Sequence, residues 1–211
     1  SRPLPDNYSV KVESGALLNA VDSLGLSGAV DVMAWSFGAL AALDFALDHP
    51  ERVRSLVLIE PPALWLLPNH GRGHDEVSRL EKLIPNARAD VSEEMLEGFL
   101  EIAGFVPPGA SARKLPQWSA WIGFRRSLRN TPAVFQHADD VARVRAFKPP
   151  VLLATGTGTS PFLRNIIDTL AATFPDVRMI EMPAGHAPHL VSSDRFFGEL
   201  KTFLEKPTAG S

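Results

Sequence analysis

The chain has 211 residues, enough for one domain with a sizeable core, and its 21 basic and 24 acidic residues leave it mildly acidic without a basic stripe. That charge balance argues against a nucleic-acid partner or an anionic membrane surface. The absence of cysteine excludes disulfides and thiolate metal sites, and it is compatible with a reducing cytoplasm, which is the location we expect.

Short apolar runs rich in β-branched residues predict strands at residues 30–33, 56–59, 151–154 and 177–182. Segments with helical periodicity are found at residues 10–24, 37–48, 132–146, 161–174 and 193–205. Uninterrupted apolar strands that alternate with helices indicate a parallel sheet covered on both faces. The sequence therefore predicts the α/β fold class.

The sequence changes character between residues 62 and 130, where amphipathic helices are expected at residues 75–84, 91–105 and 110–128. We therefore divide the chain into a core, residues 1–61 and 131–211, and an inserted helical cap, residues 62–130. The aromatic residues of the cap either form its own core or line an apolar pocket. Trp118 and Trp121 of the cap, together with Trp35 of the core, are the candidate substrate contacts.

Ser36 lies in the pentapeptide Ala34-Trp35-Ser36-Phe37-Gly38, between an expected strand and an expected helix. A small-x-Ser-x-Gly pattern in this setting is typical of a nucleophile elbow, a tight turn that exposes the serine hydroxyl at the carboxyl end of the strand. The turn requires very small side chains two positions before and after the serine, and Ala34 and Gly38 meet that requirement. Ser36 is thus the candidate nucleophile, and the Phe37 amide is a candidate oxyanion donor.

A serine hydroxyl needs a neighbouring base, and that base should follow another strand of the same sheet. His186 meets this condition, because it follows the fourth predicted strand in a loop marked by Gly185 and Pro188. His189 is the nearby rival. The other histidines receive structural interpretations: His49 at a helix end, His70 and His74 in a polar cap loop, and His137 within a helix. We expect no metal, since no carboxylate or cysteine cluster with ligand spacing accompanies His70 and His74.

The base in turn needs a third group to orient it. The common place for that acid is the loop after the third predicted strand, residues 154–161, but this loop contains no Asp or Glu, and Asp168 beyond it lies inside a helix. Glu60 ends the second predicted strand, so it lies at the same sheet edge as Ser36 and His186. We expect Glu60 to be the acid; the alternative is a charged strand end that pairs with a cap arginine.

Taken together, these motifs resemble the α/β-hydrolase superfamily. The resemblance is carried by residues 34–38, 49–61, 150–156 and 184–186. It implies a parallel sheet equivalent to strands five to eight of that fold, flanked by helices, with the helical cap inserted after strand six. It also implies a serine hydrolase, and some members carry the acid after strand six, which is the position of Glu60. The first elbow residue is Ala34 here rather than the usual glycine.

A larger departure concerns the start of the fold. Members of the superfamily have four strands before the elbow strand, and a loop among them donates a second oxyanion amide. Here fewer than thirty residues precede Val30, so the chain looks like the carboxyl-terminal part of a hydrolase, produced by a truncated reading frame, an engineered piece or a fragment. We therefore expect an exposed edge at the elbow strand, self-association through it, and weak turnover.

The leading hypothesis is a hydrolase that acts on small apolar carboxylic esters through Ser36, His186 and Glu60, without a cofactor. Within the same fold, a C–C bond hydrolase, a lactonase, a lyase or a cofactor-free haloperoxidase-like enzyme stays open. From another class, the alternative is a non-catalytic binding module or an inactive fragment. No sequence feature fixes the substrate, because cap pockets are lined by generic apolar residues.

Overall fold

The computed structural model describes residues 4–86, 88, 90–107 and 109–205. Within this part of the chain, the strands β1 (Val30–Trp35), β2 (Val53–Ile59), β3 (Val151–Gly156) and β4 (Val177–Met182) form one sheet in the order β1-β2-β3-β4. All three strand pairs are parallel. The predicted fold class is therefore confirmed, and the first three strands extend beyond their predicted bounds.

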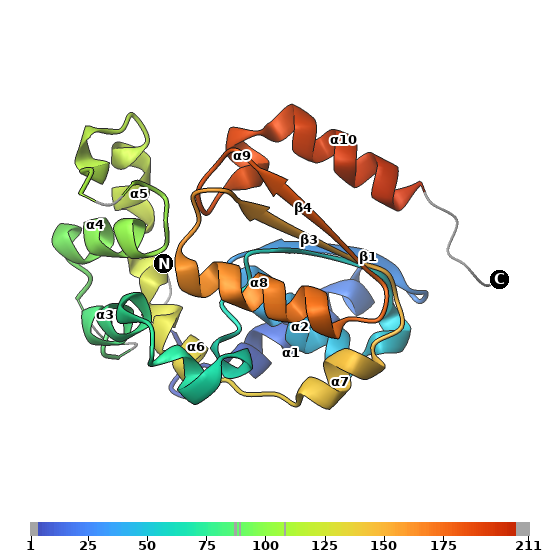
Figure 1. Ribbon diagram of the computed structural model, residues 1–211. Helices are drawn as coiled ribbons and strands as arrows, with labels where there is room; N and C mark the ends of the chain where they lie inside the picture. Colours follow the sequence, from blue (N-terminus) through green and yellow to red (C-terminus); the bar gives the residue numbers. More distant parts are fainter. Residues whose placement is uncertain (1–3, 87, 89, 108, 206–211) are drawn as a thin grey trace.

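The helices around the sheet are α1 (Val10–Ser23), α2 (Phe37–Asp48), α6 (Thr131–Gln136), α7 (Val141–Ala146), α8 (Pro161–Thr173), α9 (Pro188–Val191) and α10 (Ser193–Leu204), with a short 3₁₀ turn η1 (Pro50–Arg52). Figure 1 shows α2 and α8 on one side of the sheet and α10 on the other. None of the described helices has the length and apolar character needed to cross a membrane.

The single helix predicted over residues 132–146 is wrong, because the structure divides it into α6 and α7. His137 ends α6 in an extended conformation, so it does not lie within a helix. Asp140 then begins α7, since its side-chain oxygen accepts the Ala142 N–H at 2.8 Å. An aspartate in this capping role favours a new helix start over continuation of the previous helix.

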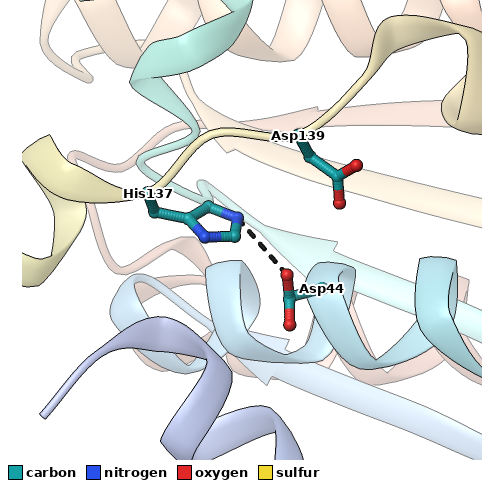
Figure 2. Close-up of side chains that lie close together, drawn as sticks. All are labelled: Asp44, His137 and Asp139. Atoms are coloured by element: carbon teal, nitrogen blue, oxygen red, sulfur yellow. Dashed lines mark ion pairs between the residues drawn. The ribbon is translucent and has the colours of Figure 1, made fainter. Parts of the chain in front are cut away.

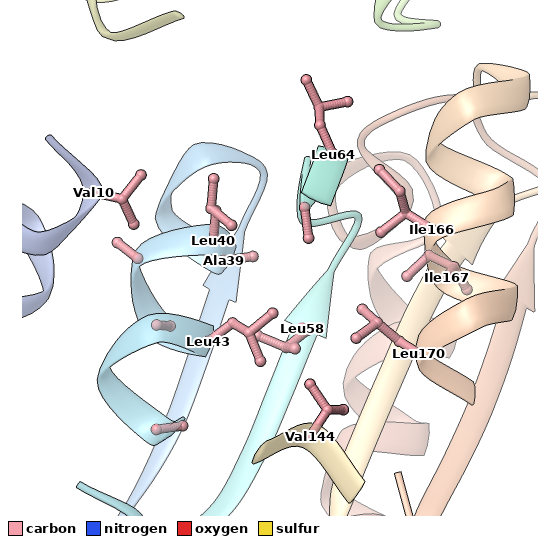
Figure 3. Packing of buried hydrophobic residues seen from close by; sticks show 14 of the residues in the cluster. Val10, Ala39, Leu40, Leu43, Leu58, Leu64, Val144, Ile166, Ile167 and Leu170 are labelled. Atoms are coloured by element: carbon pink, nitrogen blue, oxygen red, sulfur yellow. The ribbon is translucent and has the colours of Figure 1, made fainter. Parts of the chain in front are cut away.

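Alternate strand residues point to opposite faces of the sheet, and each face has its own apolar core. On the first face, Leu58 and Leu153 belong to a cluster with residues of α2, α7 and α8, part of which is seen in Figure 3. On the second face, Ile59 and Leu152 pack with Phe196 of α10. Helices thus cover both faces of the sheet, as the apolar strands predicted.

The helix α2 is buried from Ala39 to Leu47. Apart from Asp44, these buried residues are apolar, and a helix that is apolar on nearly every side is stable only where other elements cover it. Here β1 and β2 lie on one side and α1 packs on the other. The beginning of α2, and with it the position of Ser36, is therefore fixed by the core.

Between β2 and β3 lies a helical region without strands among its described residues, which we call the inserted segment (residues 62–130). It contains η2 (Leu64–Leu66), η3 (Pro68–Gly71), α3 (Asp75–Leu83), α4 (Glu93–Ile102), η4 (Ala112–Lys114), α5 (Trp118–Phe124) and η5 (Arg125–Asn130). The helix predicted over residues 110–128 is broken into three pieces, with Pro116 between the first two. Figure 1 shows α3, α4 and α5 gathered at one end of the sheet.

The strand β1 pairs with β2 on one side, and its other side has no strand partner among the residues that the structure describes. The Met33 side chain on this strand is 48% exposed. Unpaired strand edges can pair with another chain. The self-association expected through this edge stays a prediction.

Candidate active site

Ser36 links β1 to α2 through an uncommon backbone conformation. Its φ of 54° and ψ of −127° lie in a region that side chains rarely adopt. The Ser36 N–H donates to the Ile59 carbonyl at 2.9 Å, and the Ser36 carbonyl accepts the Leu40 N–H at 3.1 Å. Hydrogen bonds to β2 and to the first turn of α2 thus hold the residue on both sides.

The two small residues around Ser36 have different environments. Ala34 packs half-buried against the core of the first sheet face. Outside its chain neighbours and the backbone of its own helix, a Cβ atom at Gly38 would meet no described atom within 4 Å, and Gly38 lines an open cavity. No other described element therefore requires glycine at position 38, and the expectation that the turn itself requires a small side chain there stays a prediction.

Glu60 leaves β2 with a φ of 47° and is completely buried. Its Oε1 accepts the Gly156 N–H at 2.9 Å and the Thr155 hydroxyl at 2.8 Å, and its Oε2 accepts the Thr159 hydroxyl at 2.7 Å. A buried carboxylate requires such donors in place of water. The sequence analysis did not identify these three residues as donors to Glu60. The loop that contains them could have indicated it, because it lacks an acid but is rich in threonine hydroxyls and backbone N–H groups.

His186 joins Ser36 and Glu60. Its Nε2 lies 2.8 Å from Ser36 Oγ, and its Nδ1 lies 2.6 Å from Glu60 Oε2. The rival His189 lies in α9, where burial and the nearby His186 lower its pKa. The rival Asp168 pairs with Arg164 on the surface of α8. The structure thus brings together the three predicted side chains.

The backbone of His186 is held at both of its polar groups. Its N–H donates to the carbonyl of Gly104 in the inserted segment at 3.0 Å. Its carbonyl accepts the indole N–H of Trp35 at 2.8 Å. A Cβ at Gly185 would come within 2.0 Å of the Gly104 oxygen, so this close approach requires glycine. Both β1 and the inserted segment therefore position the imidazole.

Two cavities meet at Ser36. The larger has a volume of about 750 Å³, within the range of pockets that hold small molecules, and Trp35 and Trp121 are among its lining residues. The smaller has a volume of about 50 Å³. The residues that line both are Ser36, Phe37, Phe99, Asn130 and His186.

The remaining candidates are Phe37 and Trp118. Phe37 is the first residue of α2, where backbone N–H groups have no acceptor within the helix. Trp118 does not line either cavity; it packs with the apolar cluster of the inserted segment, and Arg113 lies 5.2 Å from its ring centre. These contacts favour Trp118 as part of the apolar core of the inserted segment over the predicted role as a substrate contact.

One group of described side chains has spacing that a metal ion would need. Asp44, His137 and Asp139 offer ligand atoms within 4.8 Å of one another; His137 Nε2 lies 3.5 Å from Asp44 Oδ1, and Figure 2 marks this pair with a dashed line. However, Lys11 Nζ lies 2.8 Å from Asp44 and Arg143 lies 2.8 Å from Asp139. Each carboxylate already has a cationic partner, so we interpret the group as an ion-pair network that ties α1 and α2 to the α6–α7 connection.

This network predicts a pH dependence of stability. Burial lowers the pKa of His137 below its ordinary value of 6.5, although Asp44 and Asp139 oppose the shift. An imidazole with a lowered pKa in the folded state binds protons better when unfolded, so the free energy of unfolding decreases as the pH falls below about 6.5. We expect His137→Gln to flatten this decrease in urea titrations between about pH 7.5 and 5. His74→Gln is the control, and equal flattening in both variants would contradict the assignment.

Comparison with known proteins identifies a family and relatives that this chain resembles. The model of the Alpha/beta hydrolase family matches residues 1–199. A putative carbamate hydrolase from Klebsiella pneumoniae is 29% identical over 199 residues, 92% of this chain and 72% of the relative. A pimeloyl-[acyl-carrier protein] methyl ester esterase from Neisseria meningitidis is 26% identical over 208 residues, 96% of this chain and 78% of the relative.

Solved structures share the fold. A hydrolase from Pseudomonas aeruginosa superposes with a TM-score of 0.74 at 22% identity, over 96% of this chain and 74% of that one. An esterase from Thermogutta terrifontis gives a TM-score of 0.71 at 16% identity, over 96% and 76% of the two chains. The family and its relatives support hydrolase activity. With the family model matched over residues 1–199, the chain belongs to the Alpha/beta hydrolase family.

Proposed function

We propose that this chain hydrolyses carboxylic esters, with Ser36 as the nucleophile, His186 as the general base and then acid, and Glu60 as the group that orients the imidazole. The observation that carries the proposal is the pair of contacts at 2.8 Å and 2.6 Å through which His186 joins Ser36 to Glu60. The three side chains come from three separate strand ends, and a surface serine without such a base is a poor nucleophile.

Glu60 sets the protonation of the ring. Its oxygens already accept hydrogen bonds from Thr155, Gly156 and Thr159, so it acts as an acceptor toward His186 Nδ1 as well. With the proton on Nδ1, the lone pair of Nε2 faces the Ser36 hydroxyl. When Nε2 takes up the serine proton, the imidazolium is stabilised by the adjacent carboxylate.

The reaction then follows from these positions. Ser36 Oγ attacks the ester carbonyl carbon, its proton passes to His186 Nε2, and the carbonyl electron pair moves onto the oxygen, toward which the Phe37 N–H donates. The tetrahedral intermediate collapses as Nε2 returns the proton to the leaving alkoxide, which departs as the alcohol. Water, deprotonated by His186, then attacks the acyl-serine. The bond between the acyl carbon and Ser36 Oγ breaks, His186 returns the proton to Ser36 Oγ, and the carboxylic acid is released.

The inserted segment fits the role of a cap. We propose that residues 1–61 and 131–211 form the catalytic core and that residues 62–130 cover it. Its own apolar cluster, which includes Ile84, Leu96 and Leu128, supports a separately packed unit. A relative named as a methyl ester esterase supports an ester substrate.

Replacement of the nucleophile tests the proposal directly. Ser36→Ala should reduce the hydrolysis of an aryl acetate by at least about 10³-fold, because the attacking oxygen is removed. A fluorophosphonate probe should label the wild type and not the variant. Circular dichroism should be unchanged, and Ser78→Ala in α3 is the control. Wild-type activity in Ser36→Ala would refute Ser36 as the nucleophile.

The two candidate acids are tested as a pair. Glu60→Gln should lower kcat by about 10²-fold or more, because an amide does not stabilise the imidazolium or fix its tautomer. Asp168→Asn should stay near the wild type, since Asp168 pairs with Arg164 away from the site. The opposite pattern would assign the acid to Asp168.

Trp35 lines the larger cavity and also donates a hydrogen bond to the His186 carbonyl. Its role is therefore either to position His186 or to contact the substrate. As a positioning residue, it should act on kcat: Trp35→Phe keeps the aromatic ring but loses the N–H, and kcat should fall about tenfold with a smaller change in KM. Trp121→Phe changes the cavity wall and keeps an aromatic ring beside Phe105, and it removes no hydrogen bond to His186, so it should act mainly on KM. A KM effect alone in Trp35→Phe would make it a substrate contact.

A further inference from the structure

The two cavities that meet at Ser36 differ greatly in size, at about 750 Å³ and about 50 Å³. The carbonyl carbon of an ester at Ser36 carries two substituents, the acyl chain and the alkoxy group, which point away from it in different directions. A cavity of about 150 Å³ can hold benzene, so the smaller cavity has room for about two or three carbon atoms. The pair of cavities therefore suits an ester with unequal substituents.

The walls of the smaller cavity are closely packed. It lies among Ala103 of the inserted segment, Val134 of α6, and Phe162 and Leu163 of α8, and each of these is at most 6% exposed. Protein interiors are packed at nearly crystalline density, so such a wall does not yield to a larger group without a cost. Its size is therefore a limit on one substituent.

The cavities also have little charge. His186 is the one ionisable side chain among the described residues that line them, and the other polar groups of the lining side chains are hydroxyls, amides and the indole N–H groups of two tryptophans. Arg125, close in sequence to this lining, has its guanidinium bound to the carbonyls of Val91 and Ile122 and lines neither cavity. Neither cavity therefore offers, among its described lining residues, a cationic partner to a carboxylate that leaves water to enter it, so a charged substituent is disfavoured.

We propose that the site selects neutral esters with one substituent of at most about three carbon atoms, seated beside Val134, and one large apolar substituent under the inserted segment. This inference rests on the proposed function and adds the substrate class. Val134 is the specificity-determining residue, since its side chain forms part of the wall that limits the small substituent.

The test compares kcat/KM for methyl hexanoate, hexyl acetate and hexyl hexanoate. We expect the better of the first two esters to exceed hexyl hexanoate by at least about tenfold, because a misfit of even one methylene costs about that much. Monomethyl adipate matches methyl hexanoate in length but carries a carboxylate, and it should be hydrolysed at least about tenfold more slowly.

Variants then test whether Val134 limits the size of the small substituent. In the preferred series, the small group is lengthened to four carbon atoms, as a butyl ester or as a pentanoyl ester, and the ratio of kcat/KM for the longer ester to that for the shorter ester is measured within each protein. Val134→Ala should raise this ratio at least about threefold by widening the smaller cavity. Val144→Ala is the matched control, because Val144, in α7, is also buried but lines neither cavity. A ratio within one protein does not depend on how much of it is folded.

The outcomes separate this inference from the proposed function. Hydrolysis of hexyl hexanoate at the rate of the better small ester, or an unchanged ratio in Val134→Ala, overturns the inference and leaves the proposed function standing. Labelling of Ser36 by a fluorophosphonate without hydrolysis of any of these esters also overturns the substrate class alone. No labelling and no hydrolysis overturn both.

Discussion

Glu60 is a completely buried carboxylate, and a buried charge is stable only where hydrogen bonds replace the water it has lost. Its donors come from β3 and the loop that follows, through Thr155, Gly156 and Thr159, and its last contact is His186 from the loop after β4. The need to satisfy this one charge therefore ties the ends of three strands together. The same contact turns the imidazole toward Ser36, so a requirement of folding also sets the geometry proposed for catalysis.

The inserted segment is connected to that geometry through the backbone of His186. The Gly104 carbonyl accepts the His186 N–H, and the neighbouring Phe105 ring packs against the imidazole at 5.0 Å. The same segment supplies much of the wall of the larger cavity, including Trp121. A shift of this segment would change the shape of the cavity and the position of the proposed base together. Substrate fit and base position are in this way linked by one structural element.

The sequence predicted what depends on local pattern and on the rules of parallel sheets. Uninterrupted apolar runs located the strands, and the shared edge of parallel strands was enough to place Ser36, Glu60 and His186 together. It did not predict features that depend on packing between distant segments. The Asp44–His137–Asp139 group joins two elements about ninety residues apart, and the position of Trp118 depends on how α5 turns within the inserted segment. The helix break at Asp140 was a local signal, an aspartate cap, that the apolar periodicity on either side concealed.

The strained backbone of Ser36 is stable because its surroundings contribute more than the strain costs. A residue in such a conformation costs about 1–3 kcal/mol. Leu40, Leu43 and Phe45 of the following helix are almost completely buried, and each contributes about 1.5–3 kcal/mol. These contributions do not involve the serine hydroxyl, so the turn keeps its shape when the hydroxyl is removed. A loss of activity in Ser36→Ala would therefore report on chemistry at this position and not on the stability of the fold.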